Sequence, residues 1–157
     1  MARLITDLAP FAGTGLPEFA SLRTVSCNPA LLQLASSRHA LLLQGPVCPF
    51  FDRLTRWLES NGTSVHRVIF QAGDRHDCHC GHPMEFDGDL KQWPEFLLKS
   101  LQQLKIDVIV LFGQARAHHA AAIALGKAAG LPVVVLEEGY VRPGYVTMEL
   151  GGVNGFS

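Results

Sequence analysis

The sequence has no apolar run of the roughly 18 to 20 residues that a membrane-spanning helix needs. Its first residues, Met1-Ala2-Arg3, are not followed by the apolar core of a signal peptide. Both absences favour a cytosolic protein, one that could still touch a membrane surface. Only four of the 157 residues are cysteine, and Cys78 and Cys80 lie two positions apart, so a secreted disulfide framework is not expected.

Several common catalytic signatures are also missing. There is no Walker lysine motif, no Gly-x-Gly-x-x-Gly after the first apolar run, and no Gly-x-Ser-x-Gly elbow. These absences argue against a P-loop NTPase, a dinucleotide oxidoreductase and an α/β hydrolase. The charges nearly balance, with 13 basic and 14 acidic residues and a net charge of -1, so we predict no nucleic-acid partner. No cofactor signature is present, and we predict no cofactor.

Short apolar runs alternate with amphipathic stretches along most of the chain. The run at residues 133–135 has the length and the β-branched residues that are typical of a buried parallel strand. The pattern predicts strands at residues 40–43, 65–70, 107–112 and 133–136, and helices near residues 50–59, 96–104 and 115–127. A βαβαβαβ order of this kind predicts an α/β fold, with a Rossmann-like parallel sheet of about four strands and helices on both faces.

Two segments lack this regular pattern. Residues 1–39 predict an irregular lead-in with one short helix near residues 30–35, and residues 40–157 form the predicted Rossmann-like domain. Residues 75–92 form a long polar segment.

Two acids, Glu137 and Glu138, follow the fourth apolar run directly. In parallel sheets of this kind, ligands bind beyond the carboxyl ends of the strands, so these acids are candidate catalytic residues. Adjacent strand residues point to opposite sides, and we expect only one of them to face a crevice. Glu138, farther past the strand, is the better candidate. The alternative is a solvated strand end without a catalytic role.

The order of the predicted strands decides which turns flank the crevice. In the order 3-2-1-4, Gln44-Gly45 and Glu137-Glu138 would flank it, whereas the order 2-1-3-4 would place Gly113 there instead. Gln44, Gly45 and Pro46 predict a backbone cradle for an anion at a helix N-terminus. A plain tight turn between strand and helix is the alternative.

Three basic side chains near these turns are further candidates. Arg116 and Arg142 suit phosphate or carboxylate binding, because a guanidinium donates two parallel hydrogen bonds, and solvated surface arginines are the alternative. His119, near the start of the third predicted helix, is a candidate base or phosphate donor. A histidine on the helix surface is the alternative reading.

One segment of seven residues contains five side chains of the kinds that bind metal ions. They are His76, Cys78, His79, Cys80 and His82. Structural zinc sites normally combine two separated pairs of ligands, and this segment supplies only one. We therefore predict a variable polar loop rather than a metal site.

Five linked motifs follow one another along the chain. They are Gln44-Gly45-Pro46-x-x-Pro49-Phe50-Phe51, His66-Arg67-x-x-Phe70-x-x-Gly73-Asp74, Leu111-Phe112-Gly113-x-x-Arg116-x-x-His119, Glu137-Glu138-Gly139-Tyr140-x-Arg142-Pro143 and Gly151-Gly152-Val153-Asn154-Gly155. Together they resemble the capsule polysaccharide biosynthesis and export family of Gram-negative bacteria. The resemblance covers about residues 40–157 and leaves out the first 39.

The resemblance implies a β-Kdo transferase, which moves 3-deoxy-D-manno-oct-2-ulosonic acid (Kdo) from CMP-Kdo to a lysophosphatidylglycerol or poly-Kdo linker. It implies the two-Rossmann-domain (GT-B) glycosyltransferase architecture, of which this chain would be the first domain. It also implies a cytoplasmic location at the inner membrane, with peripheral contact to that membrane and to capsule assembly proteins. The substrate-binding residues it implies are Gln44, Gly45, Pro46, Gly113, Arg116, His119, Tyr140, Arg142 and Asn154. The alternative is a truncated, non-catalytic Rossmann-like module that binds a ligand or a partner.

Overall fold

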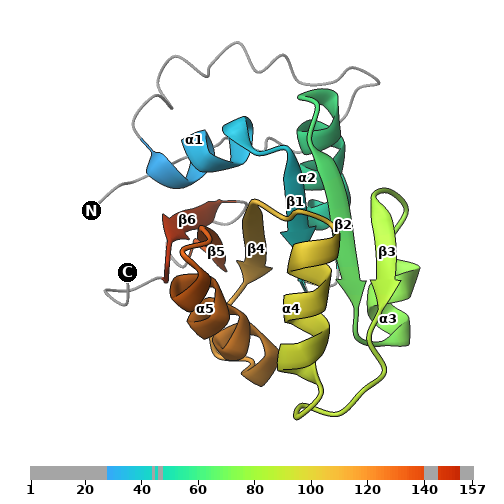
Figure 1. Ribbon diagram of the computed structural model, residues 1–157. Coiled ribbons are helices and arrows are strands. Elements are labelled where there is room, and N and C mark those ends of the chain that lie inside the picture. Colours follow the sequence, from blue (N-terminus) through green and yellow to red (C-terminus); the bar gives the residue numbers. More distant parts are fainter. Residues whose placement is uncertain (1–27, 44, 46–47, 140–144, 153–157) are drawn as a thin grey trace.

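The computed structural model describes residues 28–43, 45, 48–139 and 145–152. These residues form a six-stranded sheet in the order β3-β2-β1-β4-β5-β6 (Figure 1). The strands are β1 (His39–Leu42), β2 (Ser64–Ile69), β3 (His82–Glu85), β4 (Val108–Phe112), β5 (Val133–Glu138) and β6 (Val146–Leu150). Pairing is parallel from β3 to β5, and β6 runs antiparallel to β5. The prediction of a Rossmann-like α/β fold is confirmed, with six strands where about four were predicted.

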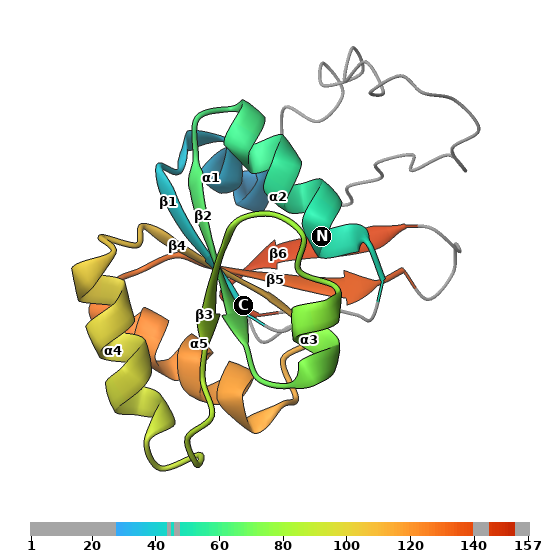
Figure 2. The same ribbon diagram turned by 90° about the vertical axis from the view of Figure 1, so that its right-hand side faces the viewer.

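Helices cover both faces of the sheet (Figure 2). They are α1 (Pro29–Ser36), α2 (Phe50–Ser60), α3 (Ala72–His76), α4 (Trp93–Gln103) and α5 (Ala117–Ala129). All three predicted helices are present as α2, α4 and α5. Gly130 ends α5 in the left-handed conformation, with φ 65°.

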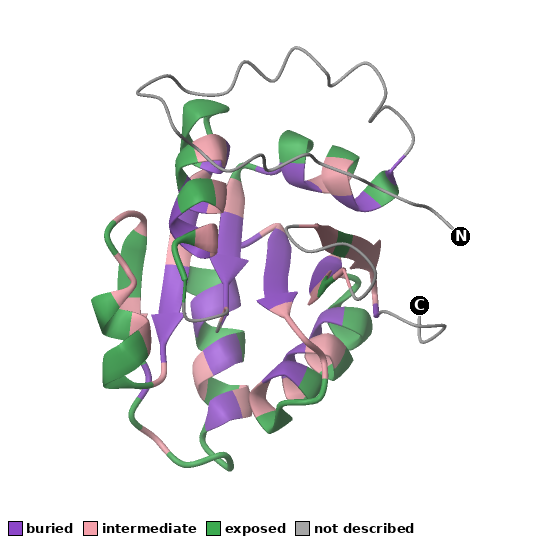
Figure 3. Ribbon diagram, turned by 180° about the vertical axis from the view of Figure 1, so that it is seen from behind, coloured by how far each residue is buried: buried purple, intermediate pink, exposed green. Residues whose placement is uncertain are grey.

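Alternation along the central strands divides the core into two layers. Ala40 and Leu42 of β1 pack toward α1 and α2, whereas Leu41 of the same strand packs toward α4 and α5. Figure 3 shows that the buried residues concentrate on the central strands and on the inner sides of the helices. A strand buried on both faces needs a largely apolar run, and for this reason the sequence predicted these strands.

The short helix α1 lies within the predicted lead-in and packs on the sheet. Asn28 caps it, since its side-chain oxygen accepts hydrogen bonds from the backbone N–H groups of Ala30 and Leu31. The Asn28 amide also donates to the Met148 carbonyl of β6 at 3.2 Å. Leu34 is fully buried in the core layer beneath α1 and α2. The capping residue therefore fixes α1 against an edge strand far along the chain.

Among the four predicted strands, the observed order is second, first, third, fourth. This is the 2-1-3-4 arrangement, and the 3-2-1-4 alternative is wrong, because β3 takes the place beside β2. The topological switch point lies between β1 and β4, so Gly113 stands at it, as that arrangement requires.

The sequence did not indicate α3, β3 and β6. Strand β3 is mostly exposed and contains Pro83, so it has neither an apolar run nor a clean alternation. Helix α3 is five residues long and has no buried residue. The long polar segment of residues 75–92 thus contains the end of α3 and all of β3. The variable loop predicted for residues 76–82 is observed between His76, the last residue of α3, and His82, the first of β3.

Gly126 allows α5 to approach β5 closely. A Cβ atom on this residue would overlap the Val133 side chain. We expect Gly126→Val to lower the free energy of unfolding by about 1 to 3 kcal/mol, as overpacked cores do. Urea denaturation measures the change, with Ala120→Val at an exposed position of the same helix as the control. Equal losses in the two variants would show that helix propensity, not packing, is responsible.

Candidate functional site

Most of the described candidate residues converge on the carboxyl edge of the sheet. Strands β1, β4 and β5 lie side by side, with Leu42 in register with Val110 and Phe112 in register with Leu136. Gly45, Gly113 and the two acids therefore follow the carboxyl ends of neighbouring strands or lie at them. Helices α2 and α5 begin at the same edge, and neither has a side-chain cap hydrogen bond in its first turn.

The two acids belong to β5 itself. The apolar run was expected to end before them, but pairing with β6 continues the ladder, with Glu137 opposite Thr147 and Glu138 opposite Val146. The pleat places Glu137 on the α5 side of the sheet with Val135, and Glu138 on the α2 side with Leu136. Glu137 is half-buried and Glu138 is exposed. The acids thus face opposite sides of the strand end, as the alternation predicted.

His119 lies in the first turn of α5 and is fully buried. The reading of this residue as a histidine on the helix surface is wrong. Its Nδ1 lies 2.6 Å from the Gly113 carbonyl oxygen, which can only accept, so Nδ1 carries the proton. Burial lowers the pKa of His119 to about 4, so the ring is neutral. Its Nε2 is then a buried acceptor that has no hydrogen-bond partner among the described residues. In this form His119 has no second N–H to donate to a phosphate.

The remaining candidates divide between described and undescribed residues. Arg116 is the N-cap of α5, with extended backbone and an exposed side chain. Gly45 is tightly packed, because a Cβ on it would lie 2.7 Å from the Phe51 ring. The other predicted substrate-binding residues lie outside the described residues; they are Gln44, Pro46, Tyr140, Arg142 and Asn154.

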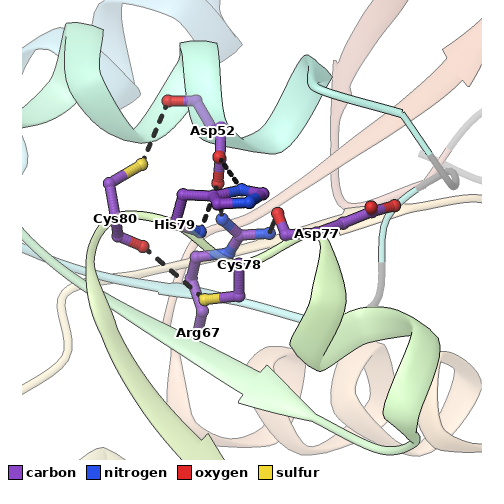
Figure 4. A network of polar contacts seen from close by, with 6 residues as sticks. All are labelled: Asp52, Arg67, Asp77, Cys78, His79 and Cys80. Carbon is purple, nitrogen blue, oxygen red and sulfur yellow. Dashed lines mark hydrogen bonds and ion pairs between the residues drawn. The ribbon is translucent and has the colours of Figure 1, made fainter.

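A second polar cluster was not predicted from the sequence (Figure 4). Asp52 in the first turn of α2 is buried and pairs with Arg67 of β2, which is buried as well. Asp52 also accepts hydrogen bonds from the backbone N–H of His79 at 3.2 Å and from its Nδ1 at 2.9 Å. Burial alone would raise the pKa of Asp52, but the hydrogen bonds from His79 and Arg67 lower it overall.

This cluster ties the connection between α3 and β3 to α2. The Arg67 guanidinium also donates to the Asp77 carbonyl at 3.3 Å, and the Cys80 thiol lies 3.3 Å from the Asp52 carbonyl oxygen. One sequence signal was available, since Arg67 is a charged residue within a predicted buried strand. Asp52, by contrast, has the spacing of an ordinary charged residue on a helix.

The cysteine- and histidine-rich segment is folded against this cluster. Within the described part of the chain, no group of three or more His, Cys, Asp or Glu side chains is arranged to hold a metal ion. Burial raises the pKa of the Cys78 and Cys80 thiols, which disfavours their thiolate forms. The described helices also include none long and apolar enough to cross a membrane.

Comparison with known proteins shows what the chain is similar to. Residues 107–157, which contain β4, α5 and the acids of β5, match the family described as capsule polysaccharide biosynthesis protein. Over these residues the chain is similar to the capsule polysaccharide biosynthesis proteins. The capsule polysaccharide export protein KpsS of Escherichia coli is 40% identical over 128 residues, which cover 82% of this chain and 33% of the relative.

The capsule polysaccharide modification protein LipB of Neisseria meningitidis, in serogroups A and B, gives a similar result. It is 39% identical over 137 residues, which cover 86% of this chain and 33% of the relative. The chain therefore aligns with about a third of the length of these capsule proteins. No solved structure gave a significant match.

We expect Asp52→Asn to lower the free energy of unfolding at pH 7 by about 3 to 5 kcal/mol, because Arg67 then stays buried without a counter-charge. The Asp52 pKa is lower in the folded state, so its stabilisation is present above the unfolded value of about 3.9 and is lost as the pH falls through the folded pKa. The difference between wild type and variant should therefore shrink in acid. Urea unfolding across this pH range measures it.

The matched control is Glu85→Gln, which breaks a surface ion pair with Arg75 at 3.3 Å. Both side chains are largely exposed, so we expect a change of less than about 1 kcal/mol. A loss at Asp52 no larger than this control would contradict a structural role for the buried pair.

Proposed function

We propose that the protein is the first Rossmann-like half of a GT-B-type glycosyltransferase that moves Kdo from CMP-Kdo to a lysophosphatidylglycerol or poly-Kdo acceptor. The observation that carries the proposal is the position of Glu137 and Glu138. They stand at the carboxyl end of β5, beside the Gly113 turn, in a chain related to capsule polysaccharide proteins. A sheet of this type binds ligands at that edge.

The chemistry of Kdo transfer needs a carboxylate. The bond between the anomeric carbon of Kdo and the phosphate oxygen breaks, and its electron pair leaves with CMP. The acceptor hydroxyl oxygen then bonds to that carbon, and its proton passes to a base. Positive charge develops at the anomeric carbon, so a carboxylate can stabilise the transition state or take the proton. Glu138 is our first choice for the base, because it is exposed at the strand end.

Basic and backbone groups at the same edge suit the anionic parts of the donor. The first-turn amides of α2 and α5 lack side-chain caps, and uncapped helix N-termini attract phosphate or carboxylate. Arg116 stands at the start of α5 and supplies an exposed guanidinium for the same purpose. We assign Arg142 to the same role only because its sequence motif resembles that of the capsule polysaccharide family. The proposal puts the protein at the cytoplasmic face of the inner membrane, where it would meet a lipid acceptor and other capsule assembly proteins.

We expect Glu138→Gln in the full-length protein to lower kcat for Kdo transfer by at least about 100-fold, because glutamine cannot take the proton. Product formation from CMP-Kdo and a lysophosphatidylglycerol acceptor measures the rate. Glu59→Gln is the control, since this exposed acid lies in the last turn of α2, at the opposite edge of the sheet. Retained turnover in the Glu138 variant would remove this residue from the mechanism.

The same assay distinguishes the transferase from the alternative function. A truncated, non-catalytic module would bind CMP-Kdo or the lipid acceptor without forming product. Binding by calorimetry, together with no transfer by a well-folded wild-type protein, would favour that alternative and contradict the transferase proposal.

A further inference from the structure

His119 is linked to the end of β5 by a continuous chain of hydrogen bonds. Its Nδ1–H donates to the Gly113 carbonyl at 2.6 Å, and the Gly113 N–H donates to the Leu136 carbonyl at 2.7 Å. Leu136 directly precedes the two acids. The chain of groups His119, Gly113 and Leu136, called here the His119 chain, thus joins the first turn of α5 to the strand end that carries Glu137 and Glu138.

Gly113 is the middle member of the His119 chain because of its backbone conformation. Its φ is 75°, in the left-handed region where a side chain is disfavoured, although a Cβ atom there would meet open space. This conformation directs the N–H of Gly113 to β5 and its carbonyl to His119. The turn is thus bonded on both sides, and His119 is the side chain that fixes the carbonyl.

Strand β6 fixes the same strand end from the other side. The Thr147 hydroxyl donates to the Glu137 carbonyl at 3.3 Å, and the Gly139 N–H donates to the Tyr145 carbonyl at 2.9 Å. Both of these bonds lie on the surface side of β5, toward the edge of the sheet. The His119 chain therefore supports the acids from the buried side of β5, beside the ladder with β4.

We propose that His119 is a positioning residue, whose Nδ1–H bond to the Gly113 carbonyl sets the place of the Glu137 and Glu138 carboxylates and which takes no proton from the substrate itself. This inference rests on the proposed function for its catalytic readout only. Complete burial keeps Nε2 away from any substrate in this structure, and the depressed pKa makes the ring a weak base. Both observations oppose the direct role that the sequence suggested for His119.

Three variants of His119 distinguish positioning from direct catalysis. The side-chain amide of asparagine can occupy the place of Nδ1–H, so His119→Asn keeps the donor to Gly113. In His119→Gln the amide reaches the place of Nε2 instead, and His119→Leu removes the donor while filling the space. We expect kcat to stay within about fivefold of wild type in the asparagine variant and to fall about 100-fold in the other two, with KM nearly unchanged, since misplacement by about 1 Å costs that much.

A second measurement needs no activity. We expect the Gly113 amide to exchange with solvent at least tenfold faster in His119→Leu than in wild type, and at the wild-type rate in His119→Asn. The Thr63 amide, bonded to the Leu58 carbonyl at 3.0 Å at the opposite edge of the sheet, is the control and should not change. Nitrogen NMR of the ring should show the proton on Nδ1.

Each outcome has one reading. Equal loss of kcat in all three variants would overturn the proposal in favour of direct catalysis, and unchanged kcat in His119→Leu would overturn it as well. Unchanged Gly113 exchange in His119→Leu would show that the His119 chain does not hold the turn. If wild type forms no product but the exchange results hold, the proposed function fails while the structural link from His119 to β5 stands.

Discussion

The parallel pairing of β1, β4 and β5 is the constraint on which the rest of the structure depends. These strands are buried on both faces, and their register brings three carboxyl ends to one edge of the sheet. Because each βα connection must leave from that edge, the first turns of α2 and α5 lie there too. The acids, the glycine turns and the helix N-termini therefore come together as a consequence of strand pairing rather than of nearness in sequence.

Polar side chains in the interior are stabilised in two different ways. Asp52 and Arg67 are both charged and buried, and each satisfies the other, with His79 completing the hydrogen bonds of the carboxylate. His119 is instead neutral and donates from one ring nitrogen to the Gly113 carbonyl, while the other nitrogen has no partner in the described part of the chain. The first cluster ties an edge connection to a helix. The second lies between a helix start and the strand end that carries the candidate acids.

The sequence was most informative where burial was deepest. Short apolar runs predicted β1, β2, β4 and β5, since strands covered on both faces consist mostly of apolar residues. The edge strands β3 and β6 were not predicted, because an exposed edge strand needs no apolar run and is defined by its hydrogen bonds to the neighbouring strand. The extension of β5 through Glu138 was not predicted either, because it depends on the antiparallel ladder with β6.

By itself the sequence determined the α/β class, the central strands, the three long helices and the expectation that Glu137 and Glu138 stand at a strand end. These features depend on local periodicity, which one segment of chain carries alone. Only the tertiary structure decided the strand order, the sides to which the two acids point, the burial of His119 and the pairing of Asp52 with Arg67. Those features depend on contacts between segments far apart in the chain and on the exclusion of solvent by packing. A local sequence pattern contains neither kind of information.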